Sequence, residues 1–129
     1  MIPKPTDAEL EILQLLWEHG PSSVRFVNDQ LNDRRLEGSN PIGYTTTLKI
    51  MQIMFKKELV LRDTKTRTHI YSAAIEEHET QQKLLKDFVD ATFRGSAMKL
   101  VMQALGNHQA SKEELDEIKA LIERIEDLK

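Results

Sequence analysis

The part of the sequence that most constrains the fold is residues 44–73, where one helical pattern is followed at once by two short strand patterns. The helical segment, residues 44–57, carries short hydroxyl side chains at its start and lysines at its end. Residues 59–62 then read as a strand, residues 63–68 as a polar turn with basic side chains, and residues 69–73 as a second strand. Helix, strand, basic turn and strand form the layout of a winged helix-turn-helix, with the turn as its wing.

The composition restricts the class of protein. A chain of 129 residues fits one domain, or one small domain with an appendage. No run of residues approaches the ~20 apolar positions that a membrane-spanning helix needs, and residues 1–5 lack the apolar core of a secretion signal. Cysteine is absent, which excludes a disulfide framework, a thiolate metal site and a thiol nucleophile. The expected location is therefore cytoplasmic.

The charge is unevenly distributed along the chain. The net charge is −3, but residues 1–75 hold ten Lys/Arg against nine Asp/Glu, a balance of +1, and residues 76–129 hold eight against twelve, a balance of −4. Residues 49–71 hold six basic and two acidic residues, a local balance of +4. Because attraction of phosphate depends on the contacting face, this cluster favours binding of duplex DNA there. A plain solvated face is the alternative interpretation.

Two more helices are predicted ahead of this region. Residues 6–9 have the spacing of a capping box, and a leucine-rich helical pattern continues from them to Gly20. A second helix is predicted to begin at Ser22 or Ser23. Residues 34–43 follow it as a polar linker, in which we expect no site.

The helix predicted from Thr45 to Lys57 has two different faces. Side chains spaced by three and four residues lie on the same side of a helix. The set expected to point inward is Thr47, Ile50, Met51 and Met54. The set expected on the outer face is Thr46, Lys49, Ile53 and Lys56. Ile53 is unusual in that second set, because a polar side chain is expected where DNA would be contacted.

The last part of the chain is predicted to be helical and rich in apolar surface. Helices of this kind usually bury such surface against a partner, and a second copy of the chain is the simplest one. We therefore predict a mainly α fold with a small β-wing: a winged helix-turn-helix domain over residues 1–75, then C-terminal dimerisation helices over residues 76–129. The residues expected at the dimer interface are Leu84, Leu85, Phe88, Leu100, Val101, Leu105, Leu115, Ile118, Leu121, Ile122 and Ile125.

Several short motifs occur in a specific order. They are Thr6-Asp7-Ala8-Glu9, Leu16-Trp17, Gly20-Pro21-Ser22-Ser23-Val24-Arg25, Gly43-Tyr44-Thr45-Thr46-Thr47-Leu48, Lys56-Lys57 with Leu59-Val60, and Tyr71. In this order the chain resembles the penicillinase-repressor family of bacterial transcription regulators, winged-helix proteins that control β-lactamase and methicillin-resistance genes. The similarity covers roughly residues 6–105.

The resemblance implies a role for each part. The helix after Gly43 would enter the major groove of DNA, and the C-terminal helices would pair two subunits on a palindromic operator. The residues implied to read bases are Tyr44, Thr45, Thr46 and Lys49. The residues implied to contact phosphates are Lys56, Arg62, Lys65 and Arg67. Independently of the resemblance, the N–H groups around Ser22 and Ser23 are expected to hold another phosphate, because they lie at a helix start.

The chain departs from the family pattern in three places. Ile53 and Glu58 stand where the family often has Arg and Gly, and the linker over residues 34–43 is a few residues longer than usual. In the resistance repressors, proteolysis at an Asn-Phe bond inactivates the protein, and alignment places Gln103-Ala104 at that position. The resemblance thus raises a membrane sensor-protease acting near Gln103 as a further partner.

Other interpretations of the reading residues stay open. Thr45 and Thr46 can instead be capping residues of the helix, and Tyr44 can be mostly packed with only its hydroxyl outward. Lys56 and Lys57 can instead complement the partial negative charge at the helix C-terminus.

No catalytic arrangement is predicted. His78-Glu79 begins like a zinc-protease motif, but Gln82 stands where the second His is required. We therefore expect no metal, no cofactor and no enzymatic activity. The predicted function is that of a bacterial transcriptional repressor that binds a palindromic operator as a homodimer, with β-lactamase-type genes as implied targets. The alternative is a winged-helix module whose basic face binds an acidic protein, without sequence-specific DNA binding.

Overall fold

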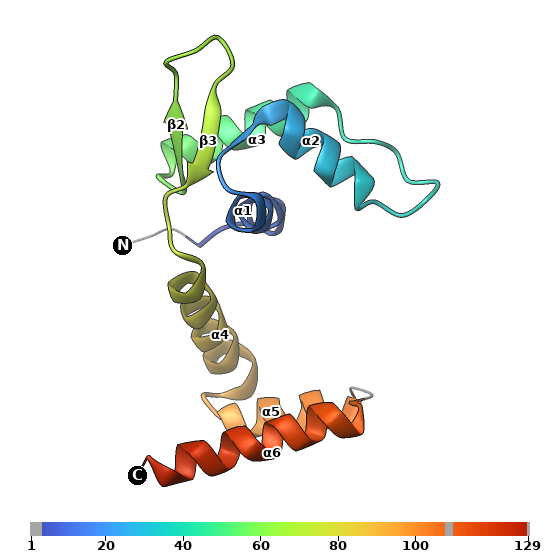
Figure 1. Ribbon diagram of the computed structural model, residues 1–129, viewed down its shortest axis with the longest axis vertical. Helices are drawn as coiled ribbons and strands as arrows, with labels where there is room; N and C mark the ends of the chain where they lie inside the picture. Colours follow the sequence, from blue (N-terminus) through green and yellow to red (C-terminus); the bar gives the residue numbers. More distant parts are fainter. Residues whose placement is uncertain (1–3, 108–109, 129) are drawn as a thin grey trace. The chain divides into compact units, whose positions relative to one another are not determined.

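The fold is mainly α-helical with one small sheet, as predicted. The computed structural model describes residues 4–107 and 110–128 (Figure 1). Its elements in chain order are α1 (Asp7–His19), β1 (Ser22–Ser23), α2 (Val24–Asp33), α3 (Tyr44–Lys56), β2 (Val60–Asp63), β3 (Ile70–Ala73), α4 (Glu77–Phe93), α5 (Ala97–Asn107) and α6 (Lys112–Asp127). They divide into two compact units, the first ending at Leu84 and the second beginning at Leu85.

The first helix, α1, begins and ends as its sequence predicts. The Glu9 amide donates to Thr6 Oγ1 over 3.2 Å, and the Thr6 amide donates to Glu9 Oε1 over 2.9 Å, which completes the capping box. At the other end Gly20 adopts a positive φ of 80° and its amide donates to the Leu16 carbonyl. Between these ends α1 buries Ile12, Leu13, Leu15 and Leu16.

One hydrophobic core holds the first unit together. Side chains of α1, α2, α3, the two wing strands and their flanking residues meet in it. Its members outside α1 are Val24, Val27, Leu31, Met51, Met54, Leu59, Val60, Tyr71 and Ile75. Trp17 packs against this core and its indole N–H donates to the Ile75 carbonyl over 3.0 Å. The core thus extends from α1 to the residues just after the wing.

The sheet has the strand order β1-β3-β2, with both pairs antiparallel. In the β2–β3 hairpin Val60 lies opposite Ala73, and the hairpin turn projects beyond the helices of the first unit (Figure 1). The sequence did not predict β1, because two serines between Gly-Pro and a helix carry no strand pattern. Ser22 lies opposite Tyr71. This pairing ties the start of α2 to the wing.

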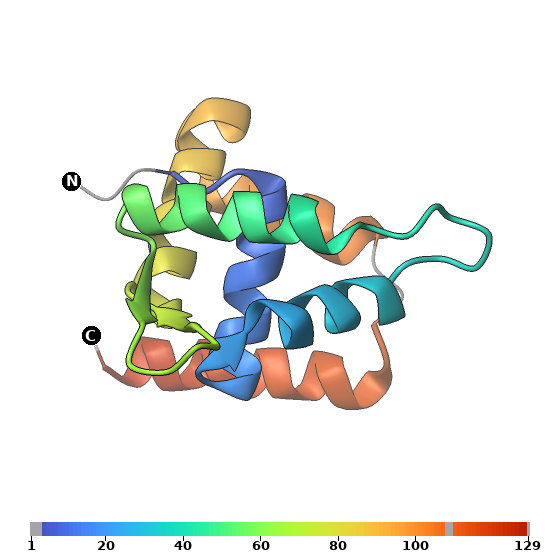
Figure 2. The ribbon, with the colours of Figure 1, turned by 90° about the horizontal axis from the view of Figure 1, so that it is seen from above.

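A network of side-chain amides fixes the connection between α2 and α3. Asn28 Nδ2 donates to Thr47 Oγ1 over 2.8 Å and to the Ile42 carbonyl over 3.0 Å. Asn32 binds both backbone groups of Ile42, accepting from its amide over 2.7 Å and donating to its carbonyl over 3.0 Å. The loop over residues 34–41 extends away from the helices and returns to them (Figures 1 and 2). Its return is fixed at Ile42 by the hydrogen bonds from Asn28 and Asn32.

The C-terminus of α3 ends in a Schellman motif. The Leu59 amide donates to the Met54 carbonyl and the Glu58 amide to the Phe55 carbonyl, over 2.9 and 3.0 Å. The residue at the left-handed position is Glu58, with φ 65°. Glycine is the residue usually found there, since a Cβ atom is disfavoured in that conformation. Glu58 therefore carries backbone strain at the junction between α3 and the wing.

An ion pair links the start of α1 to the end of α3. Lys57 Nζ lies 2.9 Å from Glu9 Oε2 and 3.1 Å from Glu9 Oε1, and only 4% of the Glu9 side chain is exposed. Burial raises the pKa of Glu9, but the Thr6 amide and the Lys57 ammonium outweigh this effect and hold the pKa below its ordinary value. Lys57 thus stabilises the fold.

The second unit buries little of its own apolar surface. Val89 is its buried hydrophobic residue among those that the structure describes, and no described residue of α6 is buried. Ser111 caps α6 by accepting from the Glu114 amide over 3.1 Å. No described helix is long and apolar enough to cross a membrane.

The three helices predicted within residues 6–57 begin within two residues of their predicted starts. The helix at residues 44–57 begins at Tyr44 and ends at Lys56, and the second wing strand begins at Ile70 instead of His69. The functional division into residues 1–75 and 76–129 stays a prediction.

Relief of the strain at Glu58 is the first testable consequence. Glu58→Gly is expected to raise the free energy of unfolding by about 0.5–1 kcal/mol, because glycine adopts a positive φ without a Cβ penalty. Urea unfolding measures this. Glu58→Ala removes the same charge but keeps Cβ, so it should give no comparable gain. Equal stabilisation by both variants would show that charge, not backbone strain, is responsible.

The buried carboxylate gives a pH-dependent prediction. Glu9→Gln should lower the free energy of unfolding by about 1–2 kcal/mol at pH 7, because Lys57 loses its charged partner. Since the folded pKa of Glu9 is depressed, its stabilisation is full above the unfolded pKa of ~4.3 and is lost as pH falls through the lower folded value. The gap between wild type and variant should therefore close in urea titrations below that pH. Glu11→Gln, at an exposed position of the same helix, is the control; a gap that stays constant down to pH 3 contradicts the assignment.

Candidate nucleic-acid interface

The outer face of α3 is exposed along its whole length. Thr47, Met51 and Met54 are buried on the inner side, as predicted, and Ile50 is partly buried. We define the outer face by its exposed residues, which are Thr45, Thr46, Lys49, Gln52, Ile53 and Lys56. The helix thus places two lysines, three uncharged polar residues and one isoleucine on one solvent-facing stripe.

The start of α3 leaves backbone donors available. Gly43 is the N-cap residue and contributes no side-chain acceptor. The first helical bond at this end runs from the Thr47 amide to the Gly43 carbonyl over 3.2 Å, so the amides of residues 44–46 have no acceptor within the helix. Thr45 and Thr46 are therefore not the N-cap residue, and the interpretation of them as capping residues is wrong.

Tyr44 lies at the edge of this face with 43% of its surface exposed. The guanidinium of Arg25, on the first turn of α2, lies 5.3 Å from the centre of the Tyr44 ring, a cation–π distance. Arg25 itself is exposed. The start of α2 and the start of α3 are thus joined through these two side chains.

The two serines before α2 are engaged within the fold. Ser22 is buried and its hydroxyl donates to the Gly20 carbonyl over 2.8 Å. Ser23 is the N-cap residue of α2 and accepts from the Phe26 amide over 3.1 Å. Ser22 already donates its O–H within the fold, whereas Ser23 accepts from Phe26 and keeps its own O–H to donate. A phosphate at this helix start would therefore meet backbone N–H groups, Arg25 and the Ser23 hydroxyl.

A hollow of about 420 Å³ brings the three elements together. The helix starts of α2 and α3 line one part of it and the end of the wing turn lines the other. Its lining residues are Ser23, Val24, Arg25, Tyr44, Leu48, Arg67, Thr68, His69 and Tyr71. Arg25 and Arg67, which are 42 positions apart in sequence, thus contribute positive charge to a single concave surface.

The wing carries its cations on exposed positions. Lys65 and Arg67 are both exposed, and the turn is shaped by a bond from the Lys65 amide to Asp63 Oδ1 over 2.9 Å. Arg62 lies differently, because its guanidinium stacks over the Phe55 ring at 4.1 Å from the ring centre. Arg62 therefore sits beside the end of α3 rather than on the wing turn.

Three residues of this surface were missed from sequence. Arg25 and Gln52 are exposed on α2 and α3, and His69 lines the hollow. For Gln52 a signal was present, because it is spaced by three and four residues from Lys49 and Lys56. Arg25 lies in one of the motifs that carry the resemblance, but only the fold brings it and His69 to one surface.

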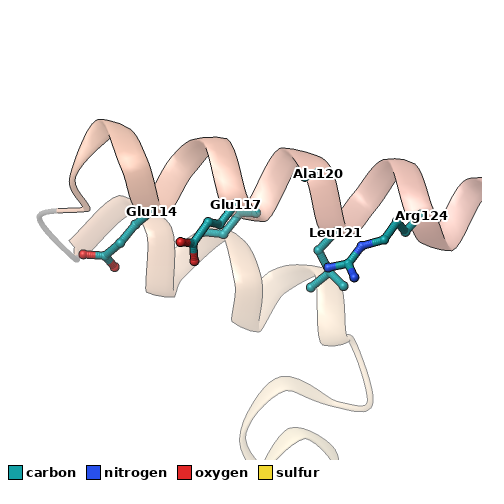
Figure 3. Close-up of a pocket in the computed structure, with 6 residues that line it drawn as sticks. Glu114, Glu117, Ala120, Leu121 and Arg124 are labelled. Atoms are coloured by element: carbon teal, nitrogen blue, oxygen red, sulfur yellow. The ribbon is translucent and has the colours of Figure 1, made fainter.

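The residues predicted at a dimer interface lie mostly at the surface of the second unit. Leu85, Phe88, Val101, Leu105, Leu115, Leu121, Ile122 and Ile125 are exposed, whereas Leu84, Leu100 and Ile118 are partly buried. Met98 and Met102 add exposed apolar surface on α5. On α6 a hollow of about 440 Å³ runs past Leu121, with Glu114, Glu117 and Arg124 along it (Figure 3).

Within residues 4–107 and 110–128 no group of three His, Cys, Asp or Glu side chains is placed to hold a metal ion. The hollow formed by α2, α3 and the wing is basic, and the exposed apolar surface belongs largely to the second unit. The fold and this surface define a winged-helix protein of the transcription-regulator class.

Comparison with known proteins specifies the family. The family model described as penicillinase repressor matches residues 5–124. The chain therefore belongs to the penicillinase repressor family, and the resemblance read from its motifs is confirmed.

Two relatives show the degree of similarity. The penicillinase repressor of Bacillus licheniformis is 25% identical over 122 residues, covering 95% of this chain and 91% of the relative. The transcriptional regulator BlaI of Mycobacterium tuberculosis is 28% identical over 109 residues, covering 81% of this chain and 75% of the relative.

Among solved structures, monomeric B. licheniformis BlaI in complex with the blaP half-operator has a TM-score of 0.49 and 23% identity, over 61% of this chain and 90% of that one.

The hollow generates a prediction for Arg25. Arg25→Ala should weaken binding of duplex DNA about equally on all sequences and reduce the salt slope of binding by about one, because one phosphate contact is lost. Fluorescence anisotropy at several salt concentrations measures the slope. Lys86→Ala removes an equal charge from α4, where Lys86 pairs with Asp90, and should leave the slope unchanged. If Arg25→Ala has the wild-type salt slope, Arg25 does not contact a phosphate and the hollow is not part of the DNA interface.

Proposed function

We propose that this protein is a transcriptional repressor that binds a palindromic operator as a homodimer. The observation that carries the proposal is the outer face of α3, a solvent-facing stripe with lysines at its middle and end and uncapped amides at its start. The wing and the hollow beside it add cations from two further elements. Membership of the penicillinase repressor family supports the same function.

Base reading is assigned to the first two turns of α3. Thr45 and Thr46 carry a methyl and a hydroxyl each, so they can contact a thymine methyl or donate to a base or a phosphate. Lys49 lies one turn further on and has the reach for a guanine edge. Tyr44 is oriented by Arg25 at the rim of the same surface.

Phosphate contacts are assigned to the surrounding cations. Lys65 and Arg67 on the wing, and Lys56 and Arg62 at the end of α3, would position the domain without specifying sequence. The N–H groups at the start of α2, next to Ser23, point toward the same kind of ligand because a helix N-terminus favours anions. Ser22 supports this site through its bond to the Gly20 carbonyl instead of touching the phosphate.

Dimerisation is assigned to the second unit. Its helices expose large apolar side chains in a density unusual for a monomer's surface, and a second copy of the chain would cover them. A two-fold symmetric dimer would present two α3 helices to half-sites about one DNA turn apart, ~34 Å, or a multiple of it. Occupancy of a promoter is then sufficient for repression.

The proposed targets are resistance genes of the β-lactamase type, because relatives named as penicillinase repressors align with most of the chain. Release by a sensor-protease is proposed at Gln103-Ala104, two exposed residues of α5. Cleavage there would separate α6 from the apolar residues before it and so divide the proposed dimer surface.

Selection of binding sites from random duplex DNA at ~150 mM salt, near physiological ionic strength, tests the proposal. We expect a two-fold symmetric motif, whose position in the genome also identifies the regulated genes. Lys49→Ala should change the recovered motif, whereas Lys86→Ala should return the wild-type motif. Recovery of no motif would contradict operator binding and would favour the alternative, in which the basic face binds an acidic protein.

A further inference from the structure

Ile53 is a large apolar side chain on the otherwise polar outer face of α3. It is 40% exposed, while Met54, the next residue, is fully buried. Helical spacing places Ile53 beside Lys49, four residues earlier, and Lys56, three residues later. Ile53 is therefore exposed on the same face as two lysines and is not part of the hydrophobic core.

The neighbours of Ile53 limit what can lie against it. Lys49 and Lys56 are exposed, and neither makes an ion pair with the described residues. A partner that covers both lysines has to carry negative charge, and one that also covers Ile53 has to offer an apolar group between those charges. The major groove of DNA offers both negative charge and an apolar group, since the C5-methyl group of thymine is the apolar group at a base edge there.

We propose that Ile53 contacts the C5-methyl group of one thymine in each operator half-site and so selects that base pair. The inference rests on the proposed function and names one specificity determinant of it. Ile53 then acts as a base reader at a position where the family often has Arg.

The spacing along α3 supports this contact. Ile53 follows Thr46 by seven residues, ~10.5 Å at ~1.5 Å per residue, which is about three base-pair steps of ~3.4 Å. The thymine read by Ile53 should therefore lie about three base pairs from the base that Thr46 contacts.

Deoxyuridine provides the test, because it pairs as thymine does but lacks the C5-methyl group. Each thymine of the selected operator is replaced in turn, symmetrically in both half-sites, and binding is measured by fluorescence anisotropy at ~150 mM salt. For the wild type we expect one position where the replacement weakens binding about fourfold per half-site, the value of one buried methyl group. For Ile53→Ala the same replacement should have no effect.

Two further variants separate the contact from general effects on the fold. Leu61→Ala shortens another exposed apolar side chain of the first unit, on β2, and should keep the wild-type sensitivity at that thymine. Ile53→Val retains the branched methyl groups and should keep most of it. A specific operator in which no thymine is coupled to Ile53 overturns this inference and leaves the proposed function standing. Absence of any specific operator overturns both.

Discussion

The buried hydrogen bond from Asn28 to Thr47 is the interaction on which the position of the outer face of α3 depends. It joins α2 to α3 over 2.8 Å, and the Thr47 side chain is completely buried. An unpaired polar group at such a site is costly, so the two helices are held in one relative arrangement. Because Asn28 also donates to the Ile42 carbonyl, the same residue fixes where the long loop returns and α3 begins. The uncapped amides of α3 and its outer face follow from that placement.

The lysines in and just after α3 differ in their surroundings. Lys57 forms an ion pair with the Glu9 carboxylate and stabilises the contact between α1 and the end of α3. Lys49 and Lys56, on the same helix, remain at the surface. A net charge of −3 is therefore compatible with attraction of a polyanion, since residues 76–129 carry a balance of −4 and residues 49–71 a local balance of +4. The contacting face decides the interaction, not the total charge.

The sequence predicted the winged-helix fold because the helices and the two wing strands carried local signals. The capping box at Thr6 and the periodicity of α3 are contained in a few consecutive residues. What the sequence could not show depends on contacts between distant segments. Strand β1, the pair of Arg25 and Tyr44, and the network around Asn28 all join residues that the chain brings together only on folding. At position 58 the sequence showed Glu where the family often has Gly, but it did not show that this residue has a positive φ.

Hydrogen exchange at single amides, with and without the selected operator duplex, tests the central claim most directly. The amides of residues 44–46 lack acceptors within α3, so they should exchange rapidly in the free protein. If α3 enters the groove by its start and outer face, exchange at these amides and in the wing turn, residues 64–69, should slow markedly in the complex. Slowed exchange confined to the loop over residues 34–41, with residues 44–46 unchanged, would contradict the account.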